Sequence, residues 1–191
     1  MNDFTLKKLE ELEKTRNEFW NLPPESGDFI NKLIKSHNIK TVLEIGTSNG
    51  YSAIWICDAL KQTGGHLVSL EFWQKRIDLA ETNLKECGLY DFATIKCGSA
   101  FTLIQELTPE DFKSTEIRPE LVFIDANKSE YIKYFELVHP LIKKGGIILA
   151  DNVTSHSEKV KPFMDNILSH KDYQSELIPF DGGLLMALKL S

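Results

Sequence analysis

The stretch Val42-Leu-Glu-Ile-Gly-Thr-Ser-Asn-Gly-Tyr-Ser52 decides the fold of this chain. It predicts a short strand, a glycine-rich turn and the start of a helix. Glycine at positions 46 and 50 lets the backbone turn tightly and approach a ligand, beside the free amides of a helix N-terminus. The spacing is GxxxG and not the GxGxxG of dinucleotide-binding turns, so we expect a cofactor with an amino-acid tail.

The rest of the chain repeats this alternation of strand and helix, which is typical of a parallel α/β sheet. The Asp181-Gly-Gly183 turn predicts that the last two strands form an antiparallel hairpin. We therefore expect a Rossmann-like, mostly parallel sheet with helices on both faces, in a single domain 1–191 with N-terminal helices in 1–38 and the sheet core in 39–191. The expected strands are 41–45, 66–70, 93–96 at an edge, 121–124, 146–150, 176–180 and 184–190; the expected helices are 4–20, 26–37, 50–61, 73–87, 100–107, 129–140 and 158–169.

Composition narrows the class of protein. The chain has 191 residues, 42% of them hydrophobic, and a formal net charge of −6. This acidic balance argues against binding along a nucleic-acid backbone, although it leaves a local basic patch possible. Three cysteines without CxxC spacing indicate neither a disulfide framework nor a zinc knuckle. The charged amino terminus lacks the apolar core of a signal peptide, so we expect a cytoplasmic protein that does not associate with membranes.

Two further loops follow strand ends, where open α/β sheets bind ligands. Glu71 ends the second strand, 21 residues after Gly50, and its carboxylate could accept hydrogen bonds from ribose hydroxyls. Gly98-Ser99-Ala100 follows the third strand and could meet an adenine edge. Together with the Gly46-Thr47-Ser48 turn, these residues predict a cofactor site.

Acidic side chains end two other strands, at Asp125 and at Asp151-Asn152. If those strands are neighbours, two carboxylates and one amide carbonyl converge, and hard oxygen ligands of this kind suit Mg²⁺ in an open site. The alternative is that these residues cap the following helices, as strand-end Asp residues commonly do. Lys128, three residues after Asp125, could be a general base or could hold an acceptor oxyanion. His156 could contact the acceptor, could contact a ligand of the metal, or could stay uninvolved.

These motifs together resemble the cation-dependent O-methyltransferases related to catechol and caffeoyl-CoA O-methyltransferases. The resemblance covers about residues 23–190 and implies a seven-stranded class I S-adenosylmethionine (SAM) methyltransferase fold. It implies cofactor contacts from Glu44, Gly46, Ser52, Glu71 and Ser99. It also implies a cation, Mg²⁺ or another such as Mn²⁺ or Ca²⁺, on Asp125, Asp151 and Asn152, with Lys128 as the catalytic lysine. The segment after Asn152 is shorter than usual in the family, so the acceptor pocket is either open or completed by a partner subunit.

We therefore expect a SAM-dependent O-methyltransferase that acts on a small hydroxyl acceptor of catechol type. Two alternatives remain at this stage: a methyltransferase for hydroxylated uridine in tRNA, and a noncatalytic nucleotide-binding module. The amphipathic first helix either forms a homodimer contact or packs on its own domain.

Overall fold

The computed structural model describes all residues 1–191 and contains one seven-stranded sheet in the order β3-β2-β1-β4-β5-β7-β6. The strands are β1 Thr41–Ile45, β2 His66–Glu71, β3 Ala93–Cys97, β4 Leu121–Ile124, β5 Ile147–Ala150, β6 Tyr173–Ile178 and β7 Leu184–Lys189. Only β7 runs against its neighbours, pairing antiparallel with β5 and β6. The predicted Rossmann-like sheet, its polar edge strand and its closing hairpin are confirmed.

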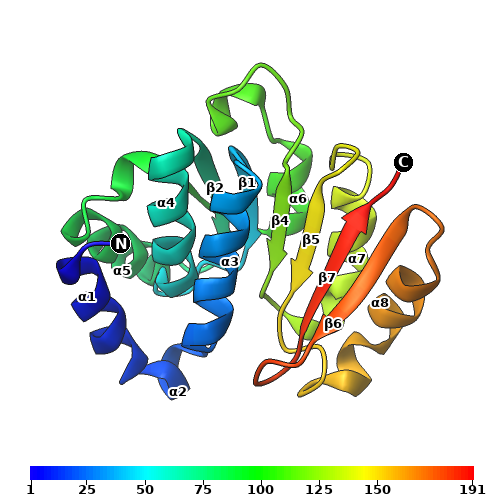
Figure 1. Ribbon diagram of the computed structural model, residues 1–191, viewed down its shortest axis with the longest axis horizontal. Coiled ribbons are helices and arrows are strands. Elements are labelled where there is room, and N and C mark those ends of the chain that lie inside the picture. The colour runs from blue at the N-terminus through cyan, green and yellow to red at the C-terminus, as the bar shows by residue number, and fades with distance from the viewer.

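Helices cover both faces of the sheet (Figure 1). They are α1 Asp3–Glu13, α2 Arg16–Phe19, α3 Pro24–Ser36, α4 Tyr51–Thr63, α5 Gln74–Glu86, α6 Ala100–Gln105, α7 Tyr131–Val138 and α8 Ser157–Ser169, with short 3-10 turns at Tyr90–Phe92, Pro109–Phe112 and Lys128–Glu130. No helix combines the length and apolarity that a bilayer crossing requires.

The alternation of side chains along each strand sorts the interior into two apolar layers. Val42 and Leu121 belong to a cluster that includes residues of α1, α3 and α4. Their neighbours Leu43 and Val122 belong to a second cluster, with residues of α6, α7 and α8. The central strands are buried on both faces, which explains why they read as continuous apolar runs rather than alternating ones.

The prediction of one helix over 4–20 is wrong, because the chain breaks between α1 and α2. Thr15 Oγ1 and Asn21 Nδ2 both donate to the carbonyl oxygen of Leu12, at 2.9 Å each. That oxygen would accept from the amide of Arg16 in a continuous helix. Leu9 and Leu12 are buried in the chain's own core, whereas Phe4 and Leu6 are exposed. The homodimer contact therefore stays a prediction, and it is limited to the side of α1 that exposes Phe4 and Leu6.

Candidate active site

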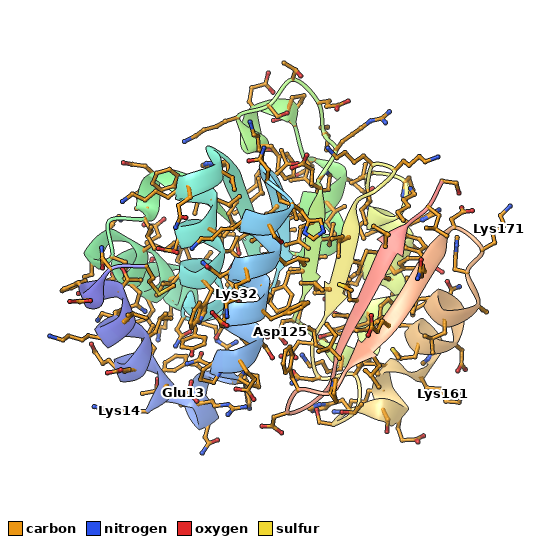
Figure 2. All side chains as sticks on the ribbon, in the orientation of Figure 1. Glu13, Lys14, Lys32, Asp125, Lys161 and Lys171 are labelled. Atoms are coloured by element: carbon orange, nitrogen blue, oxygen red, sulfur yellow. The ribbon has the colours of Figure 1, made fainter.

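A cavity of about 830 Å³ opens at the carboxyl ends of the parallel strands. This is the edge of the sheet at which Figure 2 labels Asp125. Nine of the predicted cofactor residues line the cavity: Gly46, Thr47, Ser48, Ser52, Glu71, Gly98, Ser99, Ala100 and Asp125. Predicted residues from the ends of four strands, β1 to β4, are thus brought together, as the rule for open α/β sheets requires.

Two predicted cofactor residues, Glu44 and Gly50, do not line the cavity. Glu44 is fully buried, and its carboxylate accepts hydrogen bonds from the hydroxyls of Ser52 and Ser69, at 2.5 Å each. Burial raises the pKa of Glu44 to about 7. Glu44 thus reaches the cavity lining through Ser52, and through Ser69 to Thr47, so it supports the glycine turn from behind.

The two glycines of the turn lie close to different parts of the chain, where a side chain would be crowded. Gly46 has φ +102°, and a Cβ there would lie 2.2 Å from the carbonyl oxygen of Asp125. A Cβ on Gly50, at φ +84°, would lie 3.0 Å from Ala80 in α5. The GxxxG spacing therefore lets β1 end directly beside the Asp125 loop while α4 packs closely against α5.

Glu71 connects the glycine turn to the end of β2. One carboxylate oxygen accepts from the amide of Ser48 at 2.9 Å, and the other accepts from the amides of Phe72 and Trp73 at 2.9 and 3.0 Å. A carboxylate has about four lone-pair sites, so capacity remains for a further donor such as a ribose hydroxyl. The loop conformation, and not a ligand alone, holds this acid in place.

The strands that carry the predicted cation ligands are neighbours in register, since β4 and β5 pair Ile124 with Ala150. Asp125 and Asp151 directly follow this pair, and the amide of Asp151 donates to Ile124 at 3.0 Å. Asp125, Asn152 and His156 line the cavity, whereas Asp151 lies beneath its surface and is 1% exposed.

The Asp151 carboxylate is the least satisfied polar group at this edge. Neither of its oxygens has a hydrogen-bond partner. Burial, followed by the nearby charge of Asp125, raises the pKa of Asp151 to about 7. A buried carboxylate without partners costs free energy unless something neutralises it. This unpartnered carboxylate follows β5 at the position where Asp125 follows β4, and Asn152 comes next in the chain and lines the cavity; an oxygen-rich set of this kind fits a hard divalent cation.

The capping alternative for the two acids is excluded by the helix ends. The turn after β4 is capped by Asn127, whose side chain accepts from the amide of Ser129. Helix α8 begins after His156, and no side chain caps it. Asp125 and Asp151 therefore serve neither helix.

Lys128 lies against Asp125, with Nζ 2.5 Å from Asp125 Oδ1 and 2.9 Å from the hydroxyl of Tyr131. The Tyr131 hydroxyl also lies 3.1 Å from the carbonyl oxygens of Ile124 and Asp151. Burial, together with the charges of Asp125 and Asp151, raises the pKa of Tyr131 well above its usual value, so the phenol keeps its proton. Sequence reasoning missed Tyr131, for which the only local signal was its position three residues after Lys128.

The sequence also missed the wall formed by the N-terminal segment. Arg16, Phe19 and Trp20 line the cavity. Ser48 Oγ donates to the carbonyl oxygen of Phe19 at 3.0 Å, and Arg16 forms an ion pair with Asp181 at 2.9 Å. No motif marks these residues, because their contacts are with residues 29 and 165 positions away in the chain. The remaining unpredicted lining residues include Asn49, Phe72, Trp73, Arg76, Phe101 and Tyr134.

Comparisons with known proteins agree with this geometry. The family described as O-methyltransferase matches residues 2–177. A catechol O-methyltransferase of Niastella koreensis is 35% identical over 130 residues, which are 68% of this chain and 57% of that protein. A caffeoyl-CoA O-methyltransferase of Eucalyptus globulus is 29% identical over 160 residues, 82% of this chain and 63% of that protein. The matches span less than two thirds of either relative's own length.

A solved structure extends the likeness to the whole fold. The O-methyltransferase of Bacillus cereus, determined in complex with SAH, superposes with a TM-score of 0.82 at 25% identity and covers 99% of this chain and 92% of that one. The fold of this chain is thus shared with an O-methyltransferase whose structure holds SAH. The predicted resemblance is confirmed, and the chain belongs to the O-methyltransferase family.

Proposed function

We propose that this chain is a SAM-dependent O-methyltransferase that methylates a hydroxyl of a small, catechol-like acceptor with the help of a divalent cation. The observation that supports a bound cation is the buried carboxylate of Asp151, which has no hydrogen-bond partner and follows the strand next to the one that Asp125 follows. The names of the relatives, catechol and caffeoyl-CoA O-methyltransferase, support an acceptor with adjacent hydroxyls.

Asp125, Asp151 and Asn152 would hold the cation, with Mg²⁺ as the first choice and Mn²⁺ or Ca²⁺ as alternatives. When bound, the cation would favour the ionised form of the acceptor hydroxyl, and SAM would supply the methyl group. The side chain of Asn152 is packed closely, since a Cβ on Gly182 would lie 2.8 Å from its Nδ2. The β6–β7 turn thus limits the freedom of this side chain.

Lys128 is positioned to act on the acceptor hydroxyl. Its side chain is 13% exposed, lines the cavity and is held by Asp125 and Tyr131. Nζ would either accept the acceptor's proton or hold the negative oxygen that remains. In both cases the positioning of two bound reactants supplies much of the rate enhancement.

SAM would lie along the loops after β1, β2 and β3. Glu71 would accept from the ribose, and the Gly98–Ala100 segment would meet the adenine edge. Phe72 and Trp73 are both more than half exposed and line this part of the cavity. Their rings offer apolar surface that a bound cofactor would cover.

A two-step experiment tests the proposal. Calorimetric titration with S-adenosylhomocysteine measures cofactor binding, and a radioactive methyl-transfer assay over a panel of catechols measures activity with Mg²⁺ or with a chelator. We expect binding in both conditions and transfer only with the cation. Asp125→Ala should lose at least about a hundredfold of the activity, whereas Asp165→Ala, on the exposed side of α8, should keep it.

Three outcomes would contradict parts of the proposal. Full activity of Asp125→Ala in the presence of chelator would remove the cation's role. Cofactor binding without transfer to any acceptor would favour the noncatalytic module. Transfer to bulk tRNA, together with a salt-sensitive gel shift, would favour the tRNA enzyme over the small-molecule one.

A further inference from the structure

A second group of metal-binding side chains lies away from the cavity. His139 directly follows α7, and His170 and Asp172 lie in the turn between α8 and β6. One ligand atom from each residue lies within 4.8 Å of the other two. Figure 2 labels Lys171, the residue between His170 and Asp172, at the end of the sheet opposite Asp125. The group is therefore separate from the proposed catalytic site.

Neighbouring rings hold the two imidazoles in place. The hydroxyl of Tyr173 lies 3.1 Å from His139 Nδ1, and the amide of Asp172 lies 3.3 Å from His170 Nδ1. The ring centroids of His139 and His170 are 4.9 Å apart, and the ring of Phe135 packs against both at 5.6 and 5.7 Å. All three potential ligands are half-buried. The side chains thus have little freedom to lose when they bind a ligand.

Nε2 of His139 and Nε2 of His170 form no hydrogen bond, whereas Nδ1 of His170 accepts from the amide of Asp172. The Asp172 carboxylate forms neither an ion pair nor a hydrogen bond, although Lys189 is close by. The ammonium of Lys189 instead donates to the carbonyl oxygens of His139 and Ile142, at 2.7 and 3.0 Å. It fixes the backbone after α7, and its charge disfavours cations that are held by electrostatic attraction alone. A metal here must therefore form strong bonds to nitrogen.

We propose that His139, His170 and Asp172 bind one divalent transition-metal ion, Zn²⁺ in the first instance, with water completing the coordination. Two imidazoles and a carboxylate form a nitrogen-rich set that suits Zn²⁺ and not Mg²⁺. Tyr173 would orient His139 through its second ring nitrogen, as partners of metal-bound histidines usually do. The ion would link the end of α7 to the turn that starts β6.

Histidine NMR on the whole protein tests this proposal. The chain has five histidines, so side-chain ¹H–¹⁵N spectra resolve each ring, and His139→Gln and His170→Gln assign the two signals. Zn²⁺ is titrated in millimolar Mg²⁺, which would occupy the proposed oxygen site at Asp125 and Asp151. We expect one equivalent of Zn²⁺ to shift the rings of His139 and His170 and to leave His37 and His66 unchanged.

Thermal unfolding with Zn²⁺ or with chelator gives an independent readout. Zn²⁺ should raise the melting temperature of the wild type and of the surface control His37→Gln. The affinity should fall at least about tenfold in Asp172→Asn and His170→Gln, whose chelated forms show whether they fold. The proposal is overturned if Zn²⁺ leaves both rings unshifted, or if the stabilisation persists in His170→Gln.

Discussion

Tyr131 connects the two halves of the proposed active site at the scale of a single side chain. Its hydroxyl accepts from Lys128, which lines the cavity, and lies against the backbone of Asp151, which is buried beneath it. The ring also packs edge-on against Phe163 of α8, with centroids 5.8 Å apart. A phenol held so firmly keeps the Lys128 ammonium aimed at the cavity.

Tyr131→Phe should therefore lower kcat about tenfold or more and leave the KM for SAM unchanged, because it removes one hydrogen bond to a charged group. The pH profile of kcat should also shift, since Lys128 loses a neighbour. Tyr173→Phe is the matched control, because that tyrosine is also buried but lies in β6, at the edge of the sheet. An unchanged kcat and pH profile in Tyr131→Phe would show that the hydroxyl serves only stability.

The short helix α2 lines the cavity although no motif in the sequence predicts this role. It ends at Trp20, whose backbone is left-handed with φ 55° although the residue is not glycine. The Trp20 ring is 70% exposed, lines the cavity and lies 5.3 Å from the guanidinium of Arg76. A strained backbone that presents a large exposed ring to a cavity indicates a binding role.

Trp20→Gly and Trp20→Ala separate this backbone strain from the function of the ring. Both variants should weaken S-adenosylhomocysteine or acceptor binding several-fold in calorimetry, because both lack the ring. The glycine variant should be more stable than the alanine variant by about 1 kcal/mol in urea unfolding, since only alanine keeps the left-handed penalty. Lys113, at φ 49° and outside the cavity, is the matched control. Its glycine and alanine variants should show the same stability difference without any effect on binding.

Three buried titratable groups make the stability of the whole molecule depend on pH. The pKa values of Glu44 and Asp151 are raised to about 7, chiefly by burial, whereas burial lowers the pKa of His66 to about 4. Between about pH 4 and 7 the folded state keeps two carboxyl protons that the unfolded chain has released, so stability falls as pH rises. His66 opposes this below about pH 6.5, where the unfolded chain binds a proton that the folded state does not.

The two carboxyl groups outweigh the one histidine, so the chelated protein should lose stability from about pH 5 to 7.5. The loss should amount to a few kcal/mol, since one unit of pKa shift corresponds to about 1.4 kcal/mol. Urea unfolding across this range measures it. Asp151→Asn and Glu44→Gln should each flatten the dependence. Mg²⁺ at pH 7.5 should restore the share of the lost stability that is due to Asp151. If Mg²⁺ leaves the unfolding curve of the wild type unchanged, that result would argue against a cation at that site.

Much of the candidate site was predictable because its signals are local. The end of a parallel strand has one location in the sheet, so Glu71, Asp125 and Asp151 could be assigned to one edge from sequence alone. Both turn glycines have positive φ, which fits the predicted tight turn, but Gly50 does not line the cavity, and the close neighbours of the two glycines are Asp125 and Ala80. The exposure of each acid could not be predicted, because it depends on the side chains that pack above it.

The sequence by itself determined the order of the strands and helices, the closing hairpin and the family, since periodicity, turn residues and motifs are properties of neighbouring positions. Only the tertiary structure decided that Asn21 closes on Leu12 and splits the first helix, that Trp20 reaches the cavity and that Glu44 lies behind its turn. Only it brought His139 to within reach of His170 and Asp172. Each of these features depends on side chains that come into contact because the folded sheet places their elements side by side. Such long-range contacts produce no periodic pattern in the sequence.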